Sequence, residues 1–322
     1  MARTPALLNM KVRRVASSGV EVAAHGKVNL ILRVLDRRPD GYHNLWSVMQ
    51  AFDLADTVVA EADGVSGIHL VCEGADLPAD STNLAYRAAE RVLARLKRRQ
   101  GIRLLVRKRL PVAAGVGGGS SDAAAAIQAL ATLFKTGWSR AVMAEVGQEV
   151  GSDVPFFFYG PTALVEGRGE RVSPLRLEGE RWLLLVNPGI AIPTSWAYEK
   201  LAAARATGKG RVSARPHLSH LVASSKPGEP PMVNWGDLIA AIENDFAPVM
   251  EQEFPVLRDI RLLLLERGAQ AAMLSGSGAT VFGMFSSERS AWTAAEGLDQ
   301  RSGWRVWVTR TCREPASVRL TT

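Results

Sequence analysis

The sequence predicts an α+β protein built from two lobes. The chain has 322 residues, which is more than one hydrophobic core usually organises, so two packed units are expected. Segments with the alternation of half-buried strands come early in the chain, and helices and strands mix later. Because the order is not a regular β–α–β series, α+β layers fit best.

The first predicted element is a strand over residues 20–34. Its even-numbered positions are all apolar or small, which is the pattern of a strand with one buried face. The odd positions His25, Lys27 and Asn29 therefore share the opposite face. The stretch RRPDGYHN then reads as a turn, and a second strand is expected from about residue 46, with Trp46 in the core.

The middle of the chain contains the densest run of basic residues, 87–110. Its first half has apolar residues at helical spacing and its second half alternates, so a helix followed by a strand is expected. The net charge of +7 suits an anionic partner. No aromatic residue interleaves with the basic run, as a base-stacking surface would need, so a solvated basic face is favoured over a nucleic-acid site.

Turn and capping signals divide the rest of the chain. Residues 202–232 are rich in Ala, Gly, Ser, Pro and Lys and are expected to form a mobile connection. Helices are expected at about 122–134, 139–150 (ending at Gly151), 235–241, 256–267 and 288–298. Strands are expected at 154–160, at 162–175 as a hairpin turning at Gly167–Gly169, in RWLLLVNPGIAIPT and GWRVWVTR, and after the turn of LSGSGATVFG.

Composition excludes several classes of protein. Only two cysteines are present, Cys72 and Cys312, so a disulfide framework and a CxxC metal pair are excluded. No apolar run approaches the ~20 residues that span a bilayer, and the start of the chain lacks the apolar segment of a secretory signal. A cytoplasmic protein with a loose arm over residues 1–19 is expected. His217 and His220 mimic a metal-ligand pair, but they lie in the loose connection and no metal site is expected there.

The stretch PVAAGVGGGSSDAAAAIQAL, residues 111–130, places four glycines directly before an alanine-rich helix. A helix N-terminus offers unpaired N–H groups and a partial positive charge, and glycines let the backbone wrap closely around an anion. Ser120 and Ser121 can cap the helix and also donate hydroxyls to a phosphate or to the water shell of a metal. A phosphate-binding loop is favoured over a plain glycine turn with an ordinary cap.

This loop does not match the common nucleotide motifs. It lacks the lysine of GxxxxGK[ST], and Ser120 stands where the last glycine of GxGxxG would be. A lysine for the transferred phosphate must therefore come from elsewhere. Taken alone, however, Lys27 fits a solvated charge on a strand edge, and Asp153 of GSDVPFFFYG fits a turn residue. The residues by themselves indicate only a phosphate-binding α+β protein.

Taken together and in this order, these motifs resemble the GHMP kinase superfamily. The resemblance implies an N-terminal lobe like domain 2 of ribosomal protein S5 over residues 20–178, and a ferredoxin-like C-terminal lobe over residues 179–322. The stretches that carry it span most of the chain: GKVNL (26–30), RPDGYHNL (38–45), PVAAGVGGGSSDAAA (111–125), GSDVPFF (151–157), EGRGE (166–170), NPGIAIPTSWAY (187–198) and LSGSGATVF (274–282).

The resemblance also implies an activity, the ATP-dependent phosphorylation of a small molecule with Mg²⁺. The combination of DGYH, GSDVPF and the PT…aromatic stretch points to the member that acts on the 2-hydroxyl of a cytidyl diphosphate substrate in isoprenoid precursor biosynthesis. Neither nucleic acid nor membrane is then expected as a partner. Two alternatives stay open: another GHMP kinase that acts on mevalonate, homoserine or a sugar, and a nucleotide-binding regulator without catalysis.

By the same resemblance, Asp153 is the general base, and Lys27 lies beside it and offsets charge on the transferring phosphoryl group. The family usually has Pro-Ala before this lysine, where this chain has His25-Gly26. Tyr42 and His43 are expected to hold a cytosine ring and Tyr198 to close its other side. The implied nucleotide-binding residues are Pro111, Val112, Ala113, Ala114, Gly115, Val116, Gly117, Gly118, Gly119, Ser120 and Ser121. The implied substrate-binding residues are Asn29, Tyr42, His43, Thr194, Tyr198, Gly276, Ser277 and Gly278.

Overall fold

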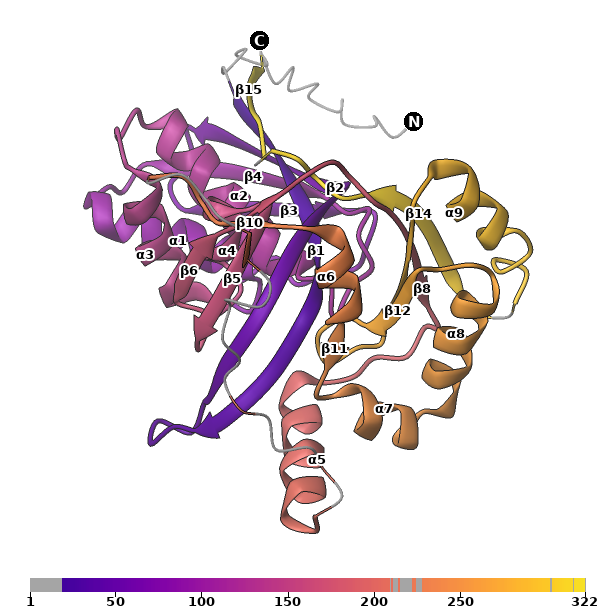
Figure 1. Cartoon of the computed structure of the whole chain (residues 1–322). Helices are drawn as coiled ribbons and strands as arrows, with labels where there is room; N and C mark the ends of the chain where they lie inside the picture. The colour runs from indigo at the N-terminus through magenta and orange to yellow at the C-terminus, as the bar shows by residue number, and fades with distance from the viewer. Residues whose placement is uncertain are drawn as a thin grey trace, which may run out of the picture.

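Two long antiparallel strands cross the centre of the molecule (Figure 1). They are β1 (Gly19–Arg37) and β2 (His43–Asp63), and they are joined by the turn predicted from RRPDGYHN. The computed structural model describes residues 19–208, 210, 214, 222–223, 228–301, 303–314 and 316–321. The expected arm over residues 1–19 therefore lies outside the described residues except for Gly19, and so do His217 and His220.

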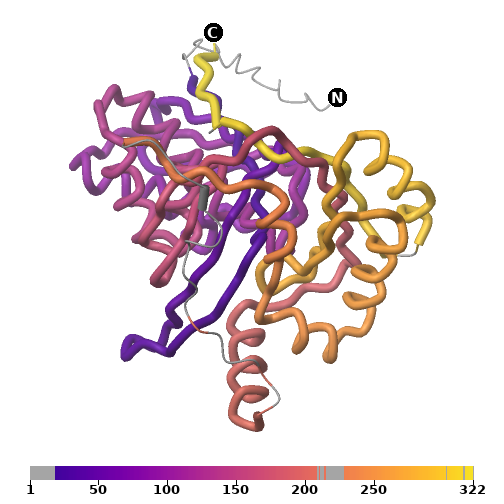
Figure 2. The backbone as a smooth tube through the Cα atoms, viewed as in Figure 1, coloured from indigo at the N-terminus to yellow at the C-terminus, as the bar shows by residue number. Residues whose placement is uncertain are grey.

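Among the described residues, β1 and β2 belong to an eight-stranded sheet. Its main order is β11-β1-β2-β4-β3, with β15 on β1 and the β5–β6 hairpin on β2. β15 returns to pair with the first residues of β1, so the two ends of the described chain lie together (Figure 2). The further strands of this sheet are β3 (Ile68–Glu73), β4 (Gly101–Arg107), β5 (Thr162–Gly167), β6 (Arg171–Pro174), β11 (Glu243–Asn244) and β15 (Val318–Thr321).

Helices α1 (Leu84–Leu96), α2 (Gly118–Leu133) and α3 (Arg140–Val150) cover one face of this sheet. The Ser139 side chain caps α3, and Gly151 ends it as predicted. α2 is buried along most of its length, and its small alanine side chains let it approach the sheet closely. The alternation in the second half of the basic stretch also holds, because the apolar positions of β4 face this core.

The other lobe contains, in the described part of the chain, a four-stranded antiparallel sheet in the order β12-β13-β8-β14. Helices α8 (Pro255–Glu266) and α9 (Glu288–Ala295) pack on it. Its strands are β8 (Trp182–Asn187), β12 (Ala271–Leu274), β13 (Val281–Phe285) and β14 (Arg305–Arg310). The chain order β8, α8, β12, β13, α9, β14 is the ferredoxin-like arrangement. The predicted α+β, two-lobed fold class is confirmed.

A core of large side chains lies between the sheets and joins the lobes, and it includes Trp46, Phe52 and Phe282. None of the helices in the described part of the chain is long and apolar enough to cross a membrane. The remaining elements are α4 (Phe156–Tyr159), α5 (Thr194–Ala206), α6 (Trp235–Ala240), α7 (Ala247–Glu253) and the short paired strands β7 (Arg176–Leu177), β9 (Val222–Ala223) and β10 (Met232–Val233).

Three predictions about single elements are wrong. Residues 154–160 are expected as a strand but contain α4, because a short apolar run has no period that separates a buried strand from a buried helix. α2 begins at Gly118 and not near residue 122, because Gly117 adopts the left-handed conformation and forms the N-cap. α5 extends to Ala206, so the first residues of the predicted mobile segment 202–232 are helical. The sequence patterns do not predict α5, α7, β3 or β15 at all.

Replacing Leu104 by Ala in β4 should destabilise the chain by about 2–5 kcal/mol, because the side chain is fully buried in the core below α1 and α2 and its loss leaves a cavity. Leu105→Ala removes the same atoms from the half-buried face of the same strand and should cost clearly less. Urea unfolding followed by circular dichroism measures both. Equal losses for the two variants would contradict the assigned strand faces.

Candidate active site

Lys27 is buried where the backbone of the glycine-rich loop packs on β1: its N–H donates to the Val116 carbonyl at 2.9 Å, and a Cβ at Gly117 would lie 3.0 Å from its side chain. The register shifts between His25 and Gly26, so that Asp53 and Leu54 of β2 bulge out of the ladder. Beyond the bulge, Lys27 is only 4% exposed. The solvated edge charge that the strand pattern alone suggests is therefore wrong.

Within the described chain, the ammonium of Lys27 has three partners. Nζ donates to Asn29 Oδ1 at 2.7 Å and to the Gly115 carbonyl at 3.2 Å, and it lies 3.3 Å from Asp153 Oδ2. Asn29 Nδ2 donates to Ser47 Oγ at 2.8 Å, and Ser47 donates to a β1 carbonyl at 2.7 Å. This chain of bonds orients the Asn29 amide with its oxygen toward the ammonium. Ser47 is a positioning residue that the sequence patterns do not reveal.

Asp153 comes from the turn that follows α3. Gly151 ends the helix, and the carboxylate of Asp153, which is 30% exposed, lies beside Lys27. The two predicted catalytic side chains, distant in the sequence, are thus brought together. A carboxylate held by an amine in a partly enclosed site can orient a hydroxyl group and accept its proton.

Asp153 lies where two cavities of the described chain meet. One, of about 530 Å³, is lined by the glycine-rich loop and is called the loop cavity below. The other, of about 540 Å³, is lined by aromatic side chains and is called the aromatic cavity. The residues that line both are Leu45, Asp153, Thr194 and Tyr198. A group bound in one cavity can therefore reach a group bound in the other at Asp153.

The glycine-rich loop lines its cavity with backbone. Gly115 and Gly117 have φ values of 76° and 71°, and a side chain at Gly115 would collide with the Ser275 carbonyl. A Cβ at Gly117 would come within 3.0 Å of the Lys27 side chain. The next three residues open α2, so their N–H groups have no partner inside the helix and carry the positive end of its dipole. This arrangement suits a phosphate group.

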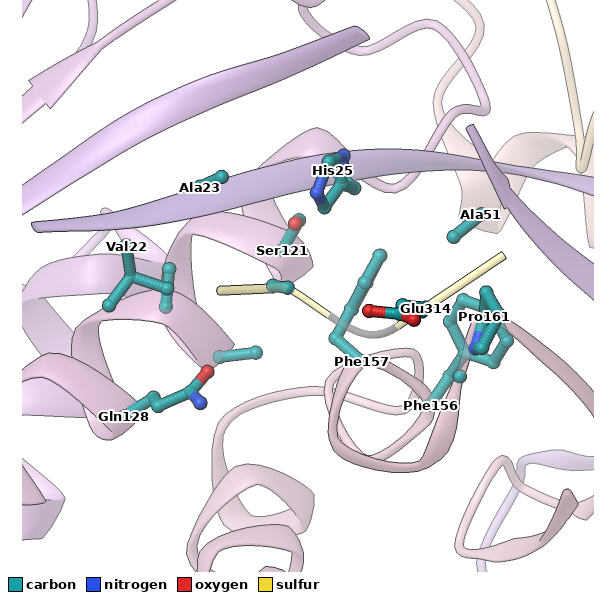
Figure 3. Close-up of a pocket in the computed structure, with 14 residues that line it drawn as sticks. Val22, Ala23, His25, Ala51, Ser121, Gln128, Phe156, Phe157, Pro161 and Glu314 are labelled. Carbon is teal, nitrogen blue, oxygen red and sulfur yellow. The ribbon is translucent and has the colours of Figure 1, made fainter. Parts of the chain in front are cut away.

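Two residues of the predicted loop do not face this cavity. The Val116 side chain is fully buried in the core between the sheets. The N–H of Ser121 bonds to the Gly117 carbonyl at 2.9 Å, and its side chain lines a separate cavity of about 20 Å³ together with His25 (Figure 3). The expectation that Ser120 or Ser121 caps α2 is also wrong, because the N-cap is Gly117. The predicted residues that do line the loop cavity are Pro111, Val112, Ala113, Ala114, Gly115, Gly117, Gly118, Gly119 and Ser120.

A second glycine loop, residues 276–278 between β12 and β13, closes the loop cavity from the other lobe. Ser275 Oγ donates to the Gly115 carbonyl at 3.0 Å, which ties the two loops together. The buried side chain of Asn244 donates to the carbonyls on either side of Ser275, at 2.8 Å each. Nothing in the sequence pattern points to Asn244, because its partners are backbone groups of a distant segment.

Aromatic side chains from the β1–β2 turn and from α5 line the aromatic cavity. His43 and Tyr198 stack with ring centroids 4.9 Å apart, and Phe246 meets Tyr198 edge-on. Tyr42 is 54% exposed, and the guanidinium of Arg168 lies 4.8 Å from its ring centroid. Burial raises the pKa of the Tyr198 phenol and lowers the pKa of His43, so both groups are uncharged at neutral pH. Arg168 and Phe246 are additions to the predicted set.

A buried ionic cluster lies beside the glycine-rich loop. Lys108, just after β4, bonds to Asp56 of β2 and, at 2.6 Å, to Asp122 Oδ2 of α2. Lys108 belongs to the stretch predicted as a solvated basic face, yet its side chain is 4% exposed. Burial raises the pKa of Asp122 to about 7, although the Lys108 ammonium opposes the shift. Two carboxyl groups share one lysine, which favours the neutral form of Asp122.

Comparison with protein families agrees with this geometry. The model of the GHMP kinases N terminal domain matches residues 83–161, and the model of the GHMP kinases C terminal domain matches residues 232–302. The first segment contains the glycine-rich loop and Asp153, and the second contains the loop at 276–278. Relatives in this family are more than 30% identical to the chain over nearly their whole length. The chain belongs to the GHMP kinase family.

Several relatives within the family carry one name. A 4-diphosphocytidyl-2-C-methyl-D-erythritol kinase from Geobacter metallireducens is 39% identical over 89% of this chain and 96% of its own. A kinase of the same name from Acetivibrio thermocellus is 37% identical over 91% of this chain and 99% of its own. A solved 4-(cytidine 5'-diphospho)-2C-methyl-D-erythritol kinase covers 90% of this chain and 98% of its own, with 33% identity and a TM-score of 0.71. A homoserine kinase from Cytophaga hutchinsonii, at 19% identity and a TM-score of 0.71 over 98% of this chain and 100% of its own, shares the fold alone.

Replacing Asp122 by Asn should change how stability depends on pH. Because the pKa of Asp122 is raised, the folded chain keeps this proton between about pH 4 and 7 while the unfolded chain loses it, so the contribution of Asp122 to wild-type stability falls as pH rises through this window. Asp122→Asn lacks this contribution. Its stability relative to the wild type should therefore increase as pH rises toward 7. Thermal unfolding across this range measures the difference, with Asp259→Asn, an exposed carboxylate on α8, as the control. A difference from wild type that is the same at every pH would contradict the raised pKa.

Proposed function

We propose that this chain transfers the γ-phosphoryl group of ATP to the 2-hydroxyl of 4-diphosphocytidyl-2-C-methyl-D-erythritol, in isoprenoid precursor biosynthesis. The observation that carries the proposal is the Lys27–Asp153 pair at the junction of two cavities, one suited to phosphates and one lined by aromatic rings. Kinases of this name are 36–39% identical to the chain over most of its length. Since the reaction consumes ATP, we also propose a cytoplasmic location.

The loop cavity is proposed for ATP. The N–H groups of Gly118, Gly119 and Ser120 stand at the positive end of α2 and can donate to phosphate oxygens. Gly115 and Gly117 have a positive φ and no side chain, so the backbone is bare where an anion must come close. Residues of both lobes line the cavity, so phosphates bound there would be enclosed from two sides.

Asp153 is the proposed general base. Its carboxylate accepts the proton of the substrate hydroxyl, the hydroxyl oxygen bonds to the γ-phosphorus, and the bond to the β–γ bridging oxygen breaks as ADP leaves. Lys27 holds the carboxylate through the ion pair, and its charge offsets the negative charge of the transferring group. The bonds from Lys27 to Asn29 and to the Gly115 carbonyl keep the ammonium in place. Positioning and electrostatics supply most of the rate gain in such transfers.

The residues around the loop cavity also suit Mg²⁺. This ion takes oxygen ligands and usually binds phosphates, waters and one or two carboxylates. Ser120 lines the cavity and offers a hydroxyl to the ion or to its water shell. A Cβ at Gly151 would lie 3.9 Å from Ser120 Oγ, so this hydroxyl is close to the turn that carries Asp153. Mg²⁺ bound there would neutralise phosphate charge.

The aromatic cavity is proposed for the cytidine end of the substrate. The exposed ring of Tyr42 offers a face on which a pyrimidine can stack, and Tyr198, one face of which is covered by His43, can offer its other face. The neutral imidazole of His43 can donate or accept a hydrogen bond at the edge of the base. Arg168 adds a positive charge to this cavity, where the diphosphate of the substrate would need one. Asp153 lies at its inner end, where the methylerythritol unit would reach.

The alternatives have less support. Solved homoserine, mevalonate and sugar kinases share the fold at 15–19% identity, and their substrates have no flat ring that an aromatic cavity would serve. A regulator without catalysis has no need of the Lys27–Asp153 pair. A coupled assay for ADP tests the choice with a panel of alcohols that includes the cytidyl-methylerythritol, mevalonate and homoserine. CMP should inhibit by competing with the cytidyl substrate and with none of the other alcohols. Turnover of another alcohol and none of the cytidyl compound would overturn the proposal.

Asp153→Asn should lower kcat by about 100- to 10,000-fold, because an amide cannot take the proton from the attacking hydroxyl. Its affinity for ATP should stay close to that of the wild type, since the loop cavity keeps its N–H groups. Steady-state kinetics and calorimetry with a non-hydrolysable ATP analogue measure the two effects. Asp259→Asn controls for the loss of one negative charge. A near-normal kcat would remove Asp153 as the base.

Tyr198→Ala should raise KM for the cytidyl substrate about tenfold or more, since stacking of a base on an aromatic ring contributes ~1–3 kcal/mol. KM for ATP should change much less. Trp292→Ala removes an exposed aromatic side chain from α9 and should leave both KM values unchanged. An equal rise of both KM values in Tyr198→Ala would exclude a specific contact with the base.

A further inference from the structure

Outside the catalytic cleft, three side chains with metal-binding chemistry come together. They are His25 on β1, Asp53 in the bulge of β2, and Cys312 just after β14. One ligand atom from each lies within 4.8 Å of the others, and Cys312 Sγ is 3.7 Å from His25 Nδ1. The proposed kinase reaction uses none of the three.

The backbone holds this cluster in place from several sides. The register shift in the β1–β2 ladder moves Asp53 out of the strand pairing and next to His25. The N–H of Cys312 donates to the Ala51 carbonyl at 2.9 Å, and Gln50 Nε2 donates to the Cys312 carbonyl at 3.1 Å. The three side chains are therefore brought together by main-chain contacts, and little ordering would be needed to bind an ion.

We propose that His25, Asp53 and Cys312 form a binding site for Zn²⁺ or a similar divalent metal. An imidazole, a carboxylate and a thiolate are the ligand types that zinc takes in proteins. With Zn–S about 2.3 Å and Zn–N about 2.0 Å, a tetrahedral site places the sulfur and nitrogen about 3.5 Å apart. The distance found between Cys312 Sγ and His25 Nδ1, 3.7 Å, is close to this value.

Arg310 and a neighbouring cavity supply the rest of the site. Arg310 Nε donates to Asp53 Oδ2 at 3.0 Å, which orients the carboxylate and leaves Oδ1 for the metal, as outer partners of metal ligands do. A cavity of about 360 Å³ is lined by His25, Asp53 and Thr57, among others, and gives room for a water as the fourth ligand.

Metal binding at this site has a defined proton balance. Without metal Cys312 is a thiol, because burial raises its pKa to about 12, and His25 is neutral, because burial lowers its pKa. His25 Nδ1 lies 3.2 Å from the Phe52 carbonyl, which favours a proton on that nitrogen. On binding, the thiol releases one proton to solvent and the imidazole moves its proton from Nδ1 to Nε2. The sulfur and Nδ1 then each give an electron pair to the metal.

A metal here would act as a structural clamp. It would cross-link β1, the bulge of β2 and the segment after β14, two residues from Lys27 on β1. His25 and Ser121 of α2 line the same small cavity (Figure 3), so the clamp would also hold the strand beside the helix that opens the loop cavity. The inference does not depend on which alcohol the kinase phosphorylates.

Metal titration of the full-length chain tests the proposal without any activity measurement. After treatment with EDTA and gel filtration, calorimetry should show one equivalent of Zn²⁺ bound to the wild type. Co²⁺, used as a spectroscopic probe, should give a thiolate-to-metal charge-transfer band. Cys312→Ser should lose this band and weaken Zn²⁺ binding by about 100-fold or more. Cys72→Ser removes the other cysteine, which lies on β3, and should keep both signals.

Further variants separate the ligands from the fold. His25→Gln and Asp53→Asn should each weaken Zn²⁺ binding at least as much as the roughly 10- to 100-fold that is typical for the loss of a residue bonded to a metal ligand. Zn²⁺ should raise the Tm of the wild type and of Cys72→Ser, and leave the Tm of Cys312→Ser unchanged. Circular dichroism without metal checks that each variant folds, and if Cys312→Ser does not fold, His25→Gln decides. Absence of Zn²⁺ binding to the wild type, or equal binding by the ligand variants, would overturn the proposal and leave the kinase proposal untouched.

Discussion

The ion pair between Lys27 and Asp153 constrains the whole cleft. A lysine that is 4% exposed is tolerated only where partners compensate its charge. Here the partners are a carboxylate, an amide oxygen and a backbone carbonyl. To bring Asp153 to this lysine, α3 must end at Gly151. α2 must begin directly after its N-cap Gly117, where a side chain would press on the lysine. The glycine-rich loop is therefore shaped by the lysine as well as by the anion that it can bind.

Periodicity predicts most of the elements around this pair, but not the places where they deviate. The alternation of residues 20–34 predicts β1 and its two faces, whereas the burial of Lys27 depends on the glycine-rich loop and on Asp153, which are distant in sequence. In the basic stretch, residues 87–110, the sequence pattern likewise does not show which charge is buried. Most of its charges are exposed as predicted, while Lys108 is buried because carboxylates from β2 and α2 converge on it. A pattern along the chain records the polarity of each residue, and the burial of a charge depends on partners that are distant in sequence.

The site depends on such distant partners even more than the fold does. Lys27 and Asp153 each have an ordinary explanation at their own position, and only the ordered set of motifs joins them. Asn244 and Ser47 carry no signal of their own, because each acts through bonds to groups elsewhere in the fold. Tyr198 is expected from its motif, but the helix that presents it is not, since α5 begins after Pro193 without a side-chain cap.

The two cavities differ in what recognises a ligand. The loop cavity presents mostly backbone, whose shape depends on glycine conformations and on the start of α2. Recognition of an anion by backbone N–H groups can persist while most side chains change. Chains only 15–19% identical accordingly keep the fold, with TM-scores of 0.65–0.71. The aromatic cavity is built from side chains, above all the stacked His43 and Tyr198 and the Tyr42–Arg168 pair. A few substitutions there can change the ligand without disturbing either lobe. Because Asp153, the proposed base, lines both cavities, a different ligand in the aromatic cavity would need only to bring a hydroxyl group to this carboxylate for the proposed chemistry to stay the same.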